Sequence, residues 1–266
     1  MSLLQQIKSK ALELGFSACG IAPSYEASSE AEYFDKWIAT GNNAGMEYMR
    51  NHREIRLNPD GLVPRAKSVI SVALNYYPKT RRPEKEPHIA YYAYGKDYHI
   101  VVKDMLRQLW KEILPLYTGD NTPDLGWIGK NTNLIIPGKG SFFFLGEIVT
   151  TWEIDEYDSS IPSKCGKCRR CLDACPTNAL TKERVLNANR CLSYLTIEHR
   201  GEFPSEISNL LGNRIYGCDT CQKVCPWNRF ASPTNIPHLK NCYHYQKTTF
   251  SHFPKKTTTE YLQNLL

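Results

Sequence analysis

The sequence lacks any apolar run that approaches the roughly 20 residues needed to cross a bilayer. Its first residues, Met1 to Leu14, mix leucine with glutamine, lysine and glutamate, so they lack the apolar stretch of a secretory signal. A strong excess of one charge is also missing, because 33 Lys and Arg stand against 27 Asp and Glu, a formal net charge of +6. This bias is too weak to indicate a nucleic-acid partner by itself. We expect a soluble, cytoplasmic, monomeric protein without membrane contact.

The composition excludes wholesale disorder and disfavours a disulfide framework. Hydrophobic residues make up 41% of the 266 positions and charged residues 23%, which is ordinary globular usage. Ten cysteines are present, yet disulfide frameworks belong to short secreted chains. Eight of the ten fall between Cys165 and Cys225, and such clustered thiols in a reducing compartment indicate metal binding. Cys19 is predicted to be a buried core thiol, and Cys242 is assigned no role.

The first part of the chain alternates between helical and strand patterns. Apolar residues recur at helical spacing over residues 4–14, 30–40 and 98–114. Short apolar runs rich in β-formers predict strands over residues 16–22, 69–74 and 141–152. The alternation predicts an α/β (α+β) fold with a first domain over residues 1–155. The cysteines then lie on a second, ferredoxin-like domain over 156–235, and residues 236–266 form a polar C-terminal tail.

The cysteines follow the bacterial ferredoxin pattern, Cys-x2-Cys-x2-Cys-x3-Cys-Pro, from Cys165 to Pro176. In this pattern three close thiolates bind one [4Fe–4S] cluster, and the fourth points to a second cluster. A further run from Cys218 to Pro226 supplies more ligands. The crossing pattern predicts one cluster on Cys165, Cys168, Cys171 and Cys225. It predicts the other on Cys175, Cys218, Cys221 and the remaining cysteine of the region, Cys191.

Zinc is the alternative metal, since Cys-x2-Cys pairs also occur in zinc ribbons and two zinc ions would use eight cysteines. The Cys-Pro endings and the spacing favour iron–sulfur clusters. Seven Lys and Arg but only two acidic residues lie from Lys164 to Arg190. These cations either balance the charge of anionic clusters or contact RNA phosphates. The candidates for phosphate contact are Lys167, Arg169 and Arg170.

Five blocks around the cysteines resemble epoxyqueuosine reductases. They are, in chain order, residues 92–99 (YAYGKDYH), 126–132 (GWIGKNT), 140–147 (GSFFFLGE), 191–198 (CLSYLTIE) and 216–228 (YGCDTCQKVCPWN). The resemblance spans about residues 50–230, and the blocks are long and specific. It implies a cobalamin-dependent enzyme with two [4Fe–4S] clusters, which reduces epoxyqueuosine to queuosine at the wobble position of the tRNA anticodon. The partners it implies are the tRNA anticodon loop and an electron donor such as a flavodoxin or ferredoxin system.

The resemblance also implies where the cobalamin lies, between the first domain and the cluster domain. Iron–sulfur clusters relay single electrons, and cobalt gathers the two electrons that opening an epoxide requires. A histidine ligand to cobalt is not predicted, because Val102 replaces the glycine of the D-x-H-x-x-G corrinoid motif that Asp97 begins. His99 is then a structural residue. The candidate cobalamin contacts are Arg56, Asp97, Tyr98, Leu134, Leu145 and Ser193.

The departing epoxide oxygen needs a proton, which the family takes from an aspartate that opens a D-x-x-P segment. Asp120 opens such a segment here, and Asp124 is the alternative. The chain lacks the helical stretch of about three turns that the family usually places between this proline and Gly126. Asp120 therefore reaches the site, is replaced by Asp124, or is only a turn residue in an inactive chain.

Two other functions stay open at this point. The same cofactors serve reductive dehalogenases, so reduction of an organohalide is the alternative reaction. A non-catalytic electron-transfer or tRNA-binding relative is the alternative from another class, and it is favoured if the shortened segment has destroyed the acid site. The helical-repeat tail of longer family members is expected to be absent or very short.

Overall fold

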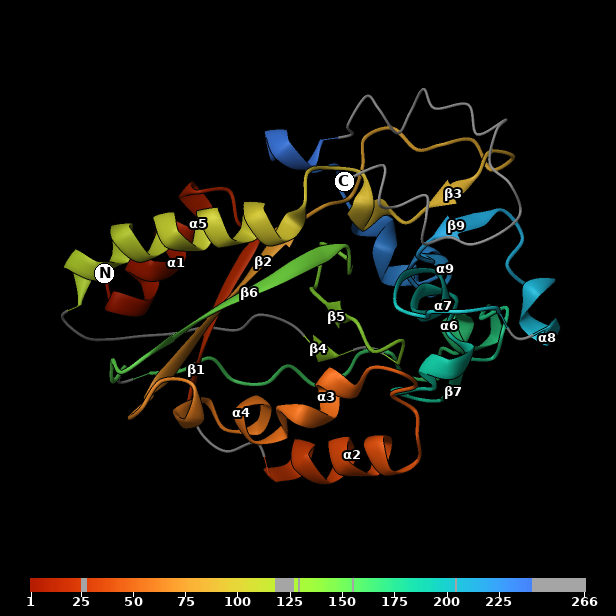
Figure 1. Cartoon of the computed structure of the whole chain (residues 1–266). Coiled ribbons are helices and arrows are strands. Elements are labelled where there is room, and N and C mark those ends of the chain that lie inside the picture. The colour runs from red at the N-terminus through yellow and green to blue at the C-terminus, as the bar shows by residue number, and fades with distance from the viewer. Residues whose placement is uncertain (25–27, 118–126, 129, 155, 204, 241–266) are drawn as a thin grey trace.

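The computed structural model describes residues 1–24, 28–117, 127–128, 130–154, 156–203 and 205–240 (Figure 1). Asp120, Asp124 and Cys242 lie outside the described residues, as does the predicted tail from residue 241 onward. Within the described ranges, no helix is both long enough and apolar enough to span a membrane.

A three-stranded antiparallel sheet forms the centre of the first part of the chain. Its strands are β1 (Ala18–Pro23), β2 (Ser68–Asn75) and β6 (Phe143–Thr150), in the order β1-β2-β6. Helices α1 (Leu3–Glu13) and α5 (Tyr98–Ile113) pack on one face of this sheet (Figure 1). The helices and strands predicted for this part are confirmed to within about two residues at each end. The mixed α/β class is confirmed as well, with antiparallel pairing throughout the sheet.

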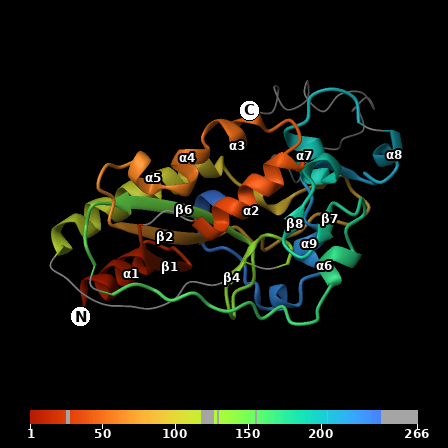
Figure 2. The ribbon, with the colours of Figure 1, turned by 90° about the horizontal axis from the view of Figure 1, so that it is seen from below.

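Strand alternation gives the two faces of the sheet different surfaces. Ile70, Val72 and Leu74 of β2 are fully buried in the core with α1 and α5. The residues between them point to the opposite face, where Gly20 and Ala73 on β1 and β2 are small and Leu145 and Glu147 on β6 are larger. Helices α2 (Ser28–Ala39), α3 (Glu47–Asn51) and α4 (Arg53–Leu57) lie on that side of the sheet (Figure 2). The sheet thus has one face packed against α1 and α5, and a second face, which we call the open face, on the side of α2, α3 and α4.

The cysteine-bearing part is built from short elements. They are β7 (Leu180–Lys182), β8 (Val185–Leu186), β9 (Arg214–Tyr216) and the helices α6 (Arg170–Asp173), α7 (Leu192–Ile197), α8 (Ser205–Ser208) and α9 (Thr220–Lys223). Strands β4 (Trp127–Ile128) and β5 (Leu134–Ile135) pair beside them, and β3 (His88–Ile89) pairs in parallel with β9. Single 3-10 turns occupy Pro59–Gly61, Tyr91–Ala93, Leu114–Leu116, Ala188–Arg190, Pro226–Phe230 and Pro237–Leu239.

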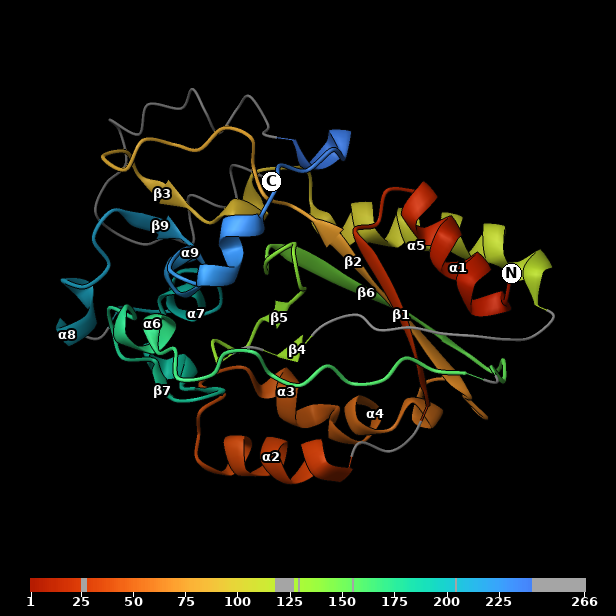
Figure 3. The same ribbon diagram turned by 180° about the vertical axis from the view of Figure 1, so that it is seen from behind.

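Hydrogen bonds join the two parts at several points. The Asp158 carboxylate, just after the predicted domain boundary at residue 155, accepts from the Ile21 N–H and from Lys8 Nζ, both at 2.6 Å. The chain after α9 turns back toward the start of α5 (Figure 3), where the Lys96 N–H donates to the His238 carbonyl at 2.9 Å. The domain boundaries stay a prediction; the contacts of Asp158 bridge the boundary at residue 155, and His238 joins the start of the predicted tail to the first domain.

Candidate iron–sulfur centre and cofactor face

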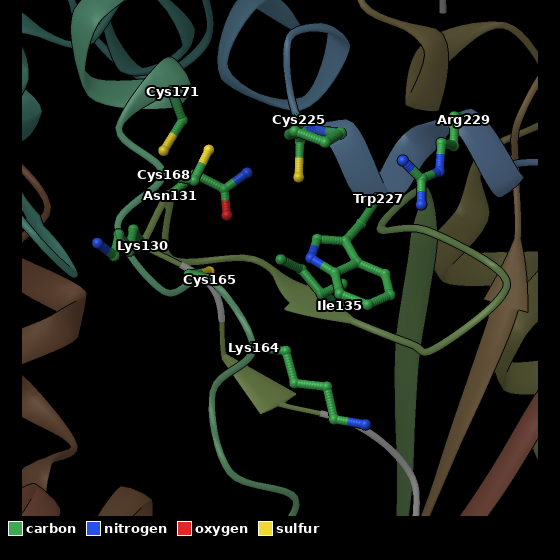
Figure 4. A pocket seen from close by; sticks show the side chains of 11 residues that line it. Lys130, Asn131, Ile135, Lys164, Cys165, Cys168, Cys171, Cys225, Trp227 and Arg229 are labelled. Carbon is green, nitrogen blue, oxygen red and sulfur yellow. The ribbon is translucent and has the colours of Figure 1, made fainter.

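Four cysteines from two distant runs surround one cavity of about 240 Å³ (Figure 4). We call them group 1; they are Cys165, Cys168, Cys171 and Cys225. Cys165 and Cys168 come from the tight loop that leads into α6, where the Cys168 N–H donates to the Cys165 carbonyl at 3.0 Å, and Cys171 lies in α6 itself. Gly166 sits in this loop with a φ of 50°, a left-handed conformation that favours glycine. The structure therefore brings together the set that the ferredoxin crossing pattern predicts for one cluster.

The other four cysteines of the region, Cys175, Cys191, Cys218 and Cys221, form a second set, group 2. Burial strongly raises the pKa of the Cys221 thiol, and the nearby charges of Cys218, Cys191 and Cys175 raise it further. Burial also raises the pKa of Cys191, while hydrogen bonds from the backbone N–H groups of Tyr194 and Ser193, at the start of α7, lower it in part. Cys171 of group 1 raises the pKa of Cys221 as well, so Cys221 lies near both groups, and the ligand set of the second cluster stays a prediction.

The local fold holds the group 2 loop against the first part of the chain. Asp219 is buried between Cys218 and Cys221, and its carboxylate accepts from the Tyr91 N–H at 2.9 Å. Gln222 is buried too, and its amide donates to the Ser141 carbonyl at 2.8 Å. Both side chains belong to residues between the cysteines of the Cys-x2-Cys-x3-Cys run. The residues between the ligands therefore make the contacts that position the cysteines.

Asn228 joins the end of the second cysteine run to the loop before β6. Its side-chain oxygen accepts from the Ser141 N–H at 2.6 Å, and its Nδ2 donates to the Gln222 carbonyl at 2.7 Å. Gly140 lies directly against this side chain with a φ of 90°, and a Cβ there would be 2.3 Å from Asn228 Oδ1. Both the positive φ and the close contact with Asn228 require glycine at this position.

A cavity lined by four thiols fits a multi-iron cluster, because each sulfur then binds a different iron around a larger body. In the described part of the chain, no three His, Cys, Asp or Glu side chains converge on the position of a single metal ion. Burial raises the pKa of Cys171 and Cys225 in the protein without metal. Metal binding must deprotonate these thiols, so assembly releases protons.

Lys130 and Asn131 belong to the group 1 cavity, although the sequence analysis assigned them no role. Lys130 is 7% exposed, and its Nζ donates to the Gly166 carbonyl at 2.7 Å and to Glu183 Oε1 at 2.6 Å. Asn131 donates to the Cys221 carbonyl at 3.3 Å, which links the group 1 cavity to a group 2 cysteine. Both residues belong to the GWIGKNT block. Their place beside the cysteines becomes evident only in the structure, where Lys130 is buried next to the group 1 loop.

The candidate cobalamin contacts occupy different elements. Leu145 of β6 points to the open sheet face, where its side chain is 54% exposed. Leu134 is in β5, Arg56 in α4 and Ser193 in α7. Asp97 caps α5 by accepting from the His99 N–H at 2.9 Å, and the Tyr98 ring stacks on Phe144 with centroids 4.3 Å apart. Asp97 and Tyr98 therefore have structural roles on the α5 side of the sheet, and all six contacts stay predictions.

The open sheet face suits a flat group. Ala18 and Gly20 of β1 pair with Ala73 and Ser71 of β2, so the part of this face that β1 and β2 form has little side-chain bulk, next to Leu145 of β6. Asn43, in the loop between α2 and α3, is buried, and neither polar atom of its amide has a partner among the described residues. A buried amide without partners is costly unless a bound group satisfies it. These features fit a large planar cofactor with polar substituents.

Two family models match parts of the chain. One is described as a 4Fe-4S double cluster binding domain and matches residues 164–228. The other is described as Epoxyqueuosine reductase QueG, DUF1730, and matches residues 56–122. The first match covers both cysteine groups, and it confirms the predicted double-cluster, ferredoxin-like part of the fold.

Curated relatives and solved structures carry the same family name. The epoxyqueuosine reductase of Cellulophaga algicola is 41% identical over 249 residues, which cover 87% of this chain and 81% of that protein. The epoxyqueuosine reductase of Leadbetterella byssophila is 40% identical over 282 aligned positions, covering 96% of this chain and 93% of that protein. This alignment is longer than the chain, so the relative has residues that the chain lacks.

The similar structures cover most of the chain. A crystal structure of epoxyqueuosine reductase with an epoxyqueuosine-modified tRNA stem loop matches with a TM-score of 0.78 at 29% identity, over 92% of this chain and 70% of that one. The structure of epoxyqueuosine reductase from Streptococcus thermophilus matches with a TM-score of 0.75 at 31% identity, over 89% of this chain and 68% of that one. The resemblance predicted from the sequence blocks is thus confirmed, and the chain belongs to the epoxyqueuosine reductase family.

Proposed function

We propose that this chain reduces epoxyqueuosine to queuosine in the wobble position of tRNA, with cobalamin and two [4Fe–4S] clusters. The observation that carries the proposal is the pair of four-cysteine groups beside an open sheet face. Group 1 and group 2 supply eight thiolates, the number that two four-iron clusters require. Family membership supplies the substrate, because curated relatives over nearly the whole chain are named for this reaction.

The geometry supports an order for the electrons. Group 2 lies next to the α2–α3 loop, because the Tyr194 hydroxyl, three residues after Cys191, accepts from the Gly45 N–H at 2.9 Å. That loop belongs to the helices on the open side of the sheet. Group 1 lines a cavity that is bordered by the exposed residues Lys164 and Arg229. Electrons would therefore enter at group 1 and pass through group 2 toward the open face.

The open face is the proposed cobalamin site. Bound cobalamin would supply a cobalt centre that delivers two electrons to the epoxide carbon. Leu145 would pack under the ring, while Leu134, Ser193 and Arg56 would contact its edge from β5, α7 and α4. The unpartnered Asn43 amide would add a polar contact to the bound group.

The proposed partner is the anticodon loop of a tRNA. One similar structure contains an epoxyqueuosine-modified tRNA stem loop, and RNA bases that undergo chemistry leave their stack to enter a pocket. We propose Asp120, with Asp124 as the alternative, as the donor of the proton that the epoxide oxygen receives. Both residues precede β4, which pairs with the β5 strand that carries Leu134.

Assays of the same preparation with two different substrates test this function. Anaerobic protein with cobalamin and reductant should convert epoxyqueuosine in tRNA to queuosine, as measured by mass spectrometry of the digested nucleosides. The same preparation should leave a chlorinated phenol unchanged. Dehalogenation without queuosine formation would establish the organohalide reductase instead. If the protein catalyses neither reaction, it is the non-catalytic relative.

A further inference from the structure

Exposed basic side chains surround the mouth of the group 1 cavity. Lys164 and Arg229 line the cavity itself, and Lys167 and Arg170 are exposed on the loop and helix that carry its cysteines. Among the described residues, none of these four is ion-paired with a carboxylate. We call these four residues the basic rim. Arg169, between them, has a single exposed partner, Asp173, at 3.5 Å.

Two aromatic side chains, Trp227 and Phe230, lie beside residues of the basic rim. Trp227 lines the cavity together with Lys164 and Cys225 (Figure 4). Phe230 is 40% exposed, and the Arg229 guanidinium lies 4.5 Å from the centroid of its ring. An apolar centre within a charged rim is the usual anatomy of a protein–protein interface. Charges that remain unpaired at the rim are the ones that steer an oppositely charged partner.

The position of the basic rim above group 1 indicates what kind of partner it serves. Cys165 and Cys168 are half-buried on an exposed loop, whereas the group 2 loop packs against the first part of the chain through the buried side chains of Asp219 and Gln222. Electron transfer falls steeply with distance, so a donor must dock beside the more accessible cluster. An RNA substrate has no need to approach this cluster, because its reaction takes place at the cofactor face.

We propose that the basic rim is the docking surface for a small acidic one-electron carrier protein of the flavodoxin class. This proposal rests on the proposed function, since it requires a cluster in group 1. Each docking oxidises the reduced carrier by one electron and reduces the group 1 cluster by one electron. Two dockings supply the two electrons that, with two protons, convert one epoxide to an alkene and water.

A charge-removal variant with a matched control tests the docking surface. The rim variant carries Lys167→Gln, Arg170→Gln and Arg229→Gln. The control carries Lys36→Gln, Lys103→Gln and Lys111→Gln, which remove the same charge from exposed positions on α2 and α5. Stopped-flow absorbance measures cluster reduction by reduced flavodoxin and, separately, by dithionite.

The rim variant should lose about tenfold or more of its bimolecular rate with flavodoxin at low salt, and the rate should depend less on ionic strength. Its iron content, its reduction by dithionite and its affinity for tRNA should match the control. Equal flavodoxin rates in both variants, with normal iron and dithionite reduction, would overturn the docking surface alone. Weaker tRNA binding at an unchanged flavodoxin rate would make the basic rim an RNA surface. A protein that binds no iron would instead overturn the proposed function itself.

Discussion

Lys130 offers a sharp test of how the fold supports the group 1 cluster. Its buried ammonium donates at 2.7 Å to the carbonyl of Gly166, between the first two cysteines of the loop, and at 2.6 Å to Glu183. Lys130→Met keeps most of the apolar stem and removes the charge and both hydrogen bonds. The Gly166 carbonyl then loses a charged donor, and the loop that presents Cys165 and Cys168 loses its anchor.

The structure sets the size of the expected loss. A hydrogen bond to a charged group contributes about 1.5–3 kcal/mol, and the ion pair with the 59% exposed Glu183 adds at most about 1 kcal/mol. Water reaches the exposed Gly166 carbonyl in the variant, which favours the lower part of this range. We expect the free energy of unfolding to fall by about 2 kcal/mol, which lowers the melting temperature by about 4–8 °C for a chain of this size.

The cluster itself provides a second readout. A cation beside four thiolates stabilises the more negative, reduced state of a cluster, so its removal should make the group 1 reduction potential more negative. Anaerobic thermal unfolding and a potentiometric titration followed by electron paramagnetic resonance measure the two effects. Glu183→Gln is the control, because it keeps the lysine and its bond to Gly166, and it should cost less than about 1 kcal/mol. An unchanged potential in Lys130→Met would refute the reasoning, as would a larger effect of the control.

Three further predictions concern the ligands, the backbone and the acid. Cys171→Ser and Cys225→Ser should remove the same cluster from a protein that otherwise holds about eight irons, and spectroscopic loss of different clusters would contradict the pairing. Gly140→Ala should destabilise the protein more than Gly138→Ala, because both have a positive φ but only the former meets a side chain at 2.3 Å. Equal melting temperatures would contradict that clash. Asp120→Asn should keep both clusters yet lose about 10²–10⁴-fold in turnover, and parental turnover would assign the proton to another group.

The sequence predicted the elements whose signal is local. The stripes of apolar residues in residues 4–14 and 98–114 gave α1 and α5, because each buries one face against the sheet. The cysteine runs predicted the four cysteines that line the group 1 cavity, since a ferredoxin loop sets its spacing within a few residues, whereas the ligand set of group 2 stays a prediction. The antiparallel order β1-β2-β6 has no such signal, because it depends on contacts between strands about 50–75 residues apart.

The parts that sequence reasoning missed are long-range contacts. The parallel pairing of His88 and Ile89 with β9 joins segments more than 120 residues apart, and no periodic pattern of apolar residues predicts it. Lys130 stood within a recognised block, but its role depends on meeting Gly166 and Glu183, which only the folded chain brings together. The contacts of Asp97 and Tyr98 on the α5 side likewise depend on which face of the sheet each residue reaches.

The most direct test of the account is the dependence of queuosine formation on both cofactors. Protein with a full complement of iron, cobalamin, a low-potential reductant and epoxyqueuosine-containing tRNA should form queuosine, with product measured by nucleoside mass spectrometry. Omission of cobalamin, or loss of either cysteine group by substitution, should abolish the product under the same conditions. Queuosine formation that persists without cobalamin, or its absence when both clusters and reduced cobalamin are present, would contradict the account.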